Sequence, residues 1–183
     1  MSTIKDFLRQ YGKAFVDATV NTPIFPSVKA AQAILETGAG QHIVGNNLFG
    51  IKANGKPSDY WKGNAISAET GEVIKGKAET ITAGFRAYQD TADSIKDHSQ
   101  FLFDNPRYKA VLTATSPEEQ ADALQAAGYA TDPEYSKKLK SIINQNDLKK
   151  LDEKKKIMKK INFIIAGLLI LATILFIFKT FKK

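Results

Sequence analysis

The 183-residue sequence contains no cysteine and only two histidines, His42 and His98. The missing thiols exclude disulfide bonds, a cysteine nucleophile and thiolate metal sites. Two histidines are too few for a histidine-rich metal centre, and we take both as structural residues. The sequence also has no glycine-rich phosphate loop, metal motif or Ser–His–Asp set. We therefore expect any activity to rest on other side chains and to need no cofactor.

Positive charge is concentrated at one end of the chain. The whole sequence carries a formal net charge of +7. Residues 149–183 contain ten lysines and two acids, a balance of +8, so residues 1–148 carry −1. A basic chain often binds nucleic acid, but here the basicity belongs to the tail. We therefore expect no nucleic-acid partner.

A long uncharged segment lies near the C-terminus. Residues 161–178, INFIIAGLLILATILFIF, hold no charge and are flanked by lysines on both sides. Eighteen helical residues span roughly 27 Å, close to the thickness of a bilayer core. The alternative is a buried core helix, although such helices are seldom apolar all round at the end of a chain. We predict a single transmembrane helix at 161–178 in contact with the lipid bilayer, followed by a short basic tail at 179–183.

The first residues give no sign of a signal peptide. The stretch MSTIKDFLRQYGKAFVDA is amphipathic and charged, without an apolar core or a small-residue cleavage site. We therefore expect a single-pass membrane protein anchored at its C-terminus. Seven lysines shortly precede the apolar segment and three follow it. The positive-inside rule then places the large domain in the cytoplasm.

Helical patterns dominate the first 148 residues. Apolar residues recur at spacings of three and four from Ile4 to Ala18, which predicts an amphipathic helix. A second helix is predicted from about Ser27 to Thr37, ended by the glycine that follows. Three further segments carry polar or proline residues typical of helix starts: ADSIKDHSQFLF, SPEEQADALQAAG and DPEYSKKLKSIINQ.

Residues 64–88 have a different pattern. They alternate, are rich in threonine, valine and isoleucine, and are interrupted by Gly71 and Gly76. This pattern predicts a β-hairpin. We therefore expect an α+β fold that is mostly α, with the small hairpin inserted between the second and third helices. The predicted boundaries are 1–147 for this domain and 148–160 for a lysine-rich connector to the transmembrane helix.

One carboxylate occupies an unfavourable position. Glu36 ends the apolar run AILE, where the negative end of the helix dipole favours the protonated carboxyl. Burial beside Ile34 and Leu35 would raise its pKa further. A carboxyl that stays protonated near neutral pH is what a general acid needs. A solvated residue at a helix end is the alternative, and these arguments alone leave it open.

Several motifs together carry a family resemblance. In order, the chain reads AILETGAG, NNLFGIKA, YWKG, ETGEVIKGK, FRAY, NPRYKAVL and AGYATDPEYSKKL. Over about residues 5–147 this combination resembles the glycoside hydrolase family 73 glucosaminidases, a lysozyme-like group of peptidoglycan hydrolases. The resemblance implies a lysozyme-like helical fold and cleavage of the β-1,4 bond after N-acetylglucosamine in peptidoglycan glycan strands. It also implies that Glu36 is the catalytic acid.

The same resemblance implies further site residues. The family stretch T-x-E-x-x-x-G-K matches TGEVIKGK at residues 70–77, which favours Glu72 as a second carboxylate and leaves Glu69 as the alternative. Tyr129 matches the family's site tyrosine in GYATDP. Many family members carry serine and tryptophan where this chain has Thr37 and Ala39, so an aromatic partner for sugar stacking is lost there. For substrate binding we single out Asn47, Phe49, Gly50, Trp61 and Tyr135.

Other functions stay open at this point. A muramidase or lytic transglycosylase on the same scaffold would cut the other glycosidic bond. A degenerate domain would bind the wall without cleaving it, and a membrane-disrupting protein would act through the lysine-flanked segment. The substrate lies outside the membrane, which conflicts with a cytoplasmic domain. A phage lysis protein, or a toxin or virion component delivered by a machine, would reconcile the two. The oligomeric state is not predicted.

Overall fold

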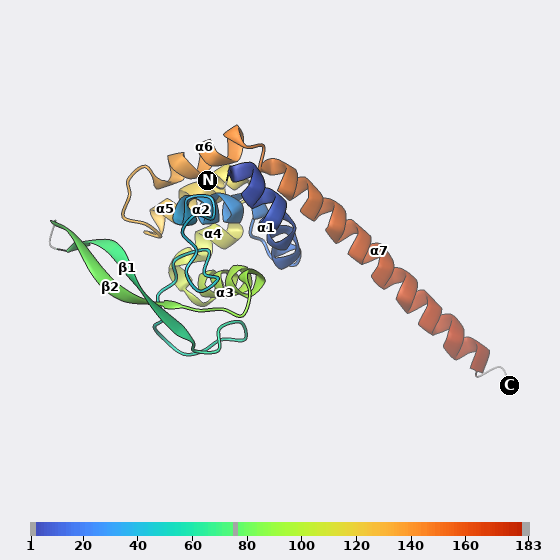
Figure 1. Cartoon of the computed structure of the whole chain (residues 1–183). Coiled ribbons are helices and arrows are strands. Elements are labelled where there is room, and N and C mark those ends of the chain that lie inside the picture. The colour runs from blue at the N-terminus through green and yellow to red at the C-terminus, as the bar shows by residue number, and fades with distance from the viewer. Residues whose placement is uncertain (1–2, 75–76, 181–183) are drawn as a thin grey trace.

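The computed structural model describes residues 3–74 and 77–180. Figure 1 shows a bundle of short helices from which a two-stranded hairpin reaches out on one side and a long last helix on the other. The helices are α1 Ile4–Thr19, α2 Pro26–Thr37, α3 Thr91–Asp104, α4 Lys109–Thr113, α5 Pro117–Ala126, α6 Tyr135–Gln145 and α7 Lys149–Thr180. The strands are β1 Ala65–Ile74 and β2 Lys77–Arg86.

The predicted helices and hairpin are confirmed, and so is the mostly helical α+β domain. The structure adds a 3-10 turn, Pro106–Tyr108, and the short helix α4 after it. Neither was predicted, because segments of three and five residues are too short to show a helical period. The sixth helix begins at Tyr135, slightly later than the Asp–Pro opening suggested.

Helix α1 is held by both its cap and its apolar face. The Thr3 hydroxyl accepts the N–H of Asp6 at 3.2 Å, and the Asp6 carboxylate accepts the Thr3 N–H at 3.4 Å. This is the reciprocal arrangement of a capping box. Phe7, Phe15 and Val16 are buried in the core. The spacing of these apolar residues therefore directs one face of α1 onto the rest of the bundle.

Helix α2 is the central element of the domain. It packs against α1, α5, α6 and α7, and nearly all of its side chains are buried. The alanines at positions 30, 31 and 33 are fully buried, which lets neighbouring helices approach closely. Gly38 follows the helix at φ 57° and ψ 48°, a left-handed conformation that glycine adopts without steric cost. The last turn, which contains Glu36, is thus held by the packing of α2 within the bundle.

The hairpin is attached to the bundle at its base. Its antiparallel register runs from Ala65 opposite Arg86 to Ile74 opposite Lys77. At the base, the Arg86 N–H donates to the Ile51 carbonyl at 2.9 Å, so the loop before the hairpin pairs with the end of β2. The strands extend away from this attachment as a two-stranded ribbon (Figure 1).

Helix α7 combines the predicted connector and the predicted membrane segment in one continuous helix. Leu148, just before its start, and Leu151 and Asp152 in its first turn are buried against the bundle. From Lys159 to Ile174 every residue is exposed. Within the described residues, this is the one helix long and apolar enough to cross a membrane. The domain boundaries remain predictions, but the first turn of the connector packs against the domain.

Candidate active site

A cleft of about 530 Å³ lies where the end of α2, the loop after it, the hairpin base and the segment after α5 meet. Five of the residues singled out from the sequence line it: Glu36, Asn47, Phe49, Gly50 and Tyr129. Glu69, the alternative second carboxylate, lines it as well, as does His42. The fold therefore gathers side chains from distant parts of the sequence around Glu36.

The turn after α2 holds Glu36 in place through backbone bonds. The N–H of Ala39 donates to the Ile34 carbonyl at 2.9 Å, and the N–H of His42 donates to the Thr37 carbonyl at 2.9 Å. The Thr37 hydroxyl donates to the Ala33 carbonyl at 2.6 Å and accepts the Gly40 N–H at 2.9 Å. A serine hydroxyl could make the same two bonds, so threonine here preserves this local structure.

Glu36 combines access to the cleft with poor solvation. Its side chain is exposed to the cleft, yet the surrounding protein removes enough water to raise the pKa of its carboxyl to about 7. The charged form is the one that loses most from desolvation. Glu36 is therefore substantially protonated near neutral pH and able to donate a proton to a molecule in the cleft.

Tyr129, in the segment after α5, lines the same cleft as Glu36. Gly128, at φ 68°, turns the chain there, and the Tyr129 N–H donates to the Leu124 carbonyl at 3.0 Å. Burial, followed by the Tyr135 hydroxyl and the Glu36 carboxylate, holds the pKa of Tyr129 well above its usual value. The Tyr129 hydroxyl therefore stays protonated.

Asn47, Phe49 and Gly50 shape the cleft in different ways. The Asn47 amide donates to the carbonyls of Ile51 and Arg86 at 2.9 and 3.1 Å, and its oxygen accepts the Phe49 and Ile51 N–H groups, both at 3.2 Å. Its hydrogen-bonding capacity is therefore used to close the loop. Gly50 lies at φ 61° with no atom within 4 Å of an added Cβ, so it leaves the cleft open.

Two predicted substrate-binding residues lie outside the cleft lining. Tyr135 is 2% exposed, and its hydroxyl accepts the Gln32 amide at 3.0 Å. Trp61 is 3% exposed, donates from its indole to the Asn64 carbonyl at 2.6 Å and lies 4.3 Å beneath the Arg86 guanidinium. Their burial places both among the supporting residues. The Trp61 ring is covered by Arg86, and its role in substrate binding stays a prediction.

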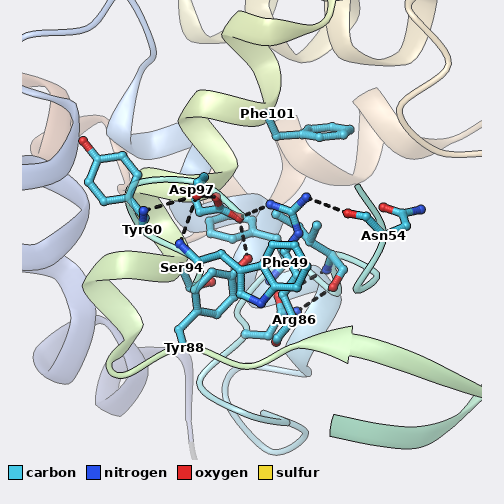
Figure 2. A network of polar contacts seen from close by, with 12 residues as sticks. Phe49, Asn54, Tyr60, Arg86, Tyr88, Ser94, Asp97 and Phe101 are labelled. Carbon is cyan, nitrogen blue, oxygen red and sulfur yellow. Dashed lines mark hydrogen bonds and ion pairs between the residues drawn. The ribbon is translucent and has the colours of Figure 1, made fainter. Parts of the chain in front are cut away.

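Figure 2 shows Asp97 of α3 at the centre of a buried polar network. Its carboxylate accepts hydrogen bonds from Arg86 at 2.6 Å, Tyr88 at 2.7 Å and Ser58 at 2.5 Å. Asp97 is buried, and the paired guanidinium offsets the cost of removing its charge from water. Arg86 ends strand β2, next to Phe85 in the cleft wall. The network therefore fastens that wall to α3.

Glu72, the predicted second carboxylate, lies at the edge of the part of the chain that the structure describes. The backbone of Glu72 lies in β1, opposite Glu79 in the antiparallel register. The side chain of Glu72, like all of Gly76, lies outside the described part. Ala68 and Thr70 precede Glu72 at alternate positions of the strand and line the cleft. The role of Glu72 as the second carboxylate stays a prediction.

The comparison with protein families agrees with this arrangement. The model of the glucosaminidase family, mannosyl-glycoprotein endo-beta-N-acetylglucosaminidase, matches residues 12–148. The chain belongs to this family of glycoside hydrolases. The match confirms the family resemblance that the motifs carried. It begins within α1, includes the remaining short helices and the hairpin, and ends where α7 begins.

Several relatives of this glucosaminidase are known. The chain is 40% identical over 147 residues to exo-glucosaminidase LytG of Bacillus subtilis, which is 76% of this chain and 50% of LytG. It is 44% identical over 122 residues to peptidoglycan hydrolase FlgJ of Escherichia coli K12, covering 63% of this chain and 38% of FlgJ. The glucosaminidase thus spans half or less of the length of these curated relatives.

Solved structures share the fold. The C-terminally truncated glycoside hydrolase domain of Salmonella typhimurium FlgJ matches with a TM-score of 0.63 and 37% identity, over 78% of this chain and 97% of that one. The catalytic domain of the autolysin Auto from Listeria monocytogenes matches with a TM-score of 0.70 and 27% identity, over 82% and 90%. The glucosaminidase domain therefore has the architecture of these hydrolase domains.

Sequence reasoning missed two buried residues next to the cleft, Lys29 and His98. His98 was taken as structural, yet its Nε2 lies 2.9 Å from the Tyr129 hydroxyl. Lys29 lies 2.6 Å from the other ring nitrogen of His98. One signal was available: Lys29, Gln32 and Glu36 are spaced at i, i+3 and i+7, which puts three polar residues on one stripe of an otherwise apolar helix.

Proposed function

We propose that this glucosaminidase hydrolyses peptidoglycan glycan strands at the β-1,4 bond after N-acetylglucosamine, with Glu36 as the general acid. The observation that carries the proposal is Glu36 itself. It ends a rigid helix, opens into a cleft and has a pKa raised to about 7. The family and the name of exo-glucosaminidase LytG support the class of reaction, and the name of peptidoglycan hydrolase FlgJ agrees with a wall substrate.

In this proposal each residue has a defined task. Glu36 gives its proton to the departing sugar oxygen as the bond from that oxygen to C1 breaks, and water supplies the new hydroxyl on C1. Tyr129 presents its protonated hydroxyl to the same cleft. Glu72 is the second carboxylate, supported by the match of TGEVIKGK at residues 70–77 to the family stretch. Glu69 remains the alternative because it lines the cleft.

Analysis of the cleavage products tests the proposal. The full-length chain is incubated with purified peptidoglycan, and the fragments are reduced and weighed by mass spectrometry. We expect fragments with reduced N-acetylglucosamine at the new end. Reduced N-acetylmuramic acid would indicate a muramidase, and an anhydro end would indicate a lytic transglycosylase. Wall binding without cleavage would identify a non-catalytic module.

We further propose that α7 anchors the protein in a bilayer through residues 161–178. Length and composition alone would also fit a helix of a soluble protein. Two observations favour the membrane: the apolar residues from Ile161 to Ile174 are exposed, and lysines flank the segment on both sides. Lysine side chains can extend along the helix to reach the headgroups. The lysine bias continues to predict a cytoplasmic domain, and since the comparisons give no support to phage or toxin lysis, the proposal includes no such role.

A further inference from the structure

A chain of hydrogen-bonded side chains runs from the core of the domain to the cleft. Lys29 on α2 and His98 on α3 are both fully buried. The Lys29 ammonium lies 2.6 Å from His98 Nδ1 and 3.1 Å from the Ile95 carbonyl. On the other side of the ring, His98 Nε2 lies 2.9 Å from the Tyr129 hydroxyl. The proposed reaction gives no task to Lys29 or His98.

Burying a lysine in this position is costly. Loss of water lowers the pKa of Lys29 well below its usual value, although the charge of Asp97 opposes the shift. An apolar residue of similar volume would fill the same space without that cost. The stretch VKAAQAIL is otherwise apolar except for Gln32, so packing alone does not require a lysine there.

Two contacts stabilise the charged form of Lys29 against this loss of water. Its nitrogen lies 5.0 Å from the centre of the Phe49 ring, within the range of a cation–π interaction. The Ile95 carbonyl accepts one of its hydrogens. An ammonium group has three donors and no acceptor. In this form Lys29 donates to His98, and His98 Nδ1 accepts.

The direction of the Lys29–His98 hydrogen bond determines the direction of the next hydrogen bond, between His98 and Tyr129. Burial, with the positive charge of Lys29, lowers the pKa of His98 well below its usual value, so the ring is neutral. A neutral imidazole that accepts at Nδ1 carries its hydrogen on Nε2. Nε2 then donates to the oxygen of Tyr129. The hydrogen of the Tyr129 hydroxyl is consequently directed away from His98, toward the cleft.

We propose that Lys29 and His98 are positioning residues that make the Tyr129 hydroxyl a fixed hydrogen-bond donor to an oxygen of the bound sugar. Their effect on turnover rests on the proposed function, whereas the donor direction does not. The stacked Phe49 ring, 4.0 Å from the His98 ring and 8° from parallel, holds the imidazole in plane. A donor set before the substrate arrives costs no reorganisation during the reaction.

The tautomer of His98 tests the donor direction independently of activity. Nitrogen NMR of the full-length chain in detergent micelles distinguishes a protonated from a bare ring nitrogen. The chain has only two histidines, so a His42→Gln variant assigns the signals. We expect hydrogen on Nε2 and none on Nδ1 near neutral pH. Hydrogen on Nδ1 would mean that a neutral Lys29 accepts, and would overturn the proposal.

Kinetics on purified peptidoglycan test the consequence for the reaction. Lys29→Met should lower kcat about tenfold with little change in KM. A tenfold loss is about the contribution of one hydrogen bond to a charged group. His98→Gln keeps an N–H donor and should retain more activity than His98→Leu. The matched control is Lys109→Met, which changes an exposed lysine and should leave kcat unchanged.

A double variant links the buried pair to the tyrosine. Lys29→Met should cause little further loss in a Tyr129→Phe background, because the group that it positions is already gone. Fully additive losses would overturn the proposal. Normal turnover by Glu36→Gln would contradict the proposed function. The NMR experiment would still decide the donor direction of Tyr129.

Discussion

The backbone N–H of Ser27 donates to the carboxylate of Asp152 at 3.0 Å and ties the first turn of α2 to the first turn of α7. Phe25, the N-cap residue of α2, has no side-chain acceptor. Lys155 adds hydrogen bonds to the carbonyls of Thr22 and Ile24 at 2.8 and 2.7 Å. The helix that presents Glu36 at one end is therefore capped at its other end by the C-terminal helix.

Loss of this cap should destabilise the domain. Asp152→Ala leaves the buried Ser27 N–H without its acceptor, which should lower the free energy of unfolding by about 1–3 kcal/mol. Urea unfolding followed by circular dichroism measures the change. Glu153→Ala, the exposed neighbour, is the control and should change little. Equal stability of both variants would show that α7 does not support α2.

Alanine substitutions at Gly38 and Gly12 distinguish the effect of backbone strain from the effect of packing. Gly38→Ala should lower the free energy of unfolding by about 1–2 kcal/mol, because its φ of 57° is costly for any residue with a Cβ. The His42 ring, 3.3 Å from the added Cβ, must also move. In Gly12→Ala the added Cβ meets Leu151 at an ordinary 3.7 Å, and helix propensity favours alanine. We expect Gly12→Ala to be neutral or stabilising in the same unfolding assay, and a greater loss from it than from Gly38→Ala would contradict this account.

The raised pKa of Glu36 makes two predictions about pH. Activity should fall as the pH rises through about 7, because the general acid loses its proton there. The folded state favours the neutral carboxyl, so stability from this group is present below its ordinary pKa near 4.5 and is lost as the pH rises to about 7. Glu36→Gln should therefore be more stable than the wild type at pH 8 and about equal at pH 4. Thermal melts at the two pH values measure this; the opposite order would contradict the raised pKa.

The membrane proposal is tested by fractionation. Full-length protein should stay in the membrane fraction after carbonate extraction, and a chain ending at Lys160 should be soluble. Truncation after Lys160 keeps Leu151, Asp152 and Lys155 in their contacts with the domain, whereas truncation after Asp147 removes them. If carbonate releases the full-length chain as readily as the shortened one, α7 is not a membrane anchor.

Local patterns were sufficient for most of the fold. The apolar spacing in α1, the glycine after Thr37 and the alternation in the hairpin each act over a few residues, so the sequence predicts them directly. The position of Glu36 at a helix end also followed from local residues. Desolvation, the second of the two reasons given for a raised pKa of Glu36, is its cause in the structure.

The contacts that surround Glu36 could not be predicted in the same way. Lys29 and His98 are 69 positions apart, and only the tertiary fold brings them together. Trp61 was singled out for substrate binding, but Arg86 from the end of β2 covers its ring. Such pairs depend on tertiary packing, for which a single sequence carries no local signal.

Turnover of purified peptidoglycan by three glutamine variants tests the central claim most directly. Glu36→Gln keeps the shape of the side chain and removes the transferable proton, so turnover should fall by about 10²–10⁴ while the fold survives. Glu72→Gln should also lower turnover, and Glu69→Gln, three residues away, should change it little. A severe loss from Glu69→Gln with none from Glu72→Gln would exchange the roles of those two residues. Near-normal turnover by Glu36→Gln would contradict the assignment of Glu36 as the general acid.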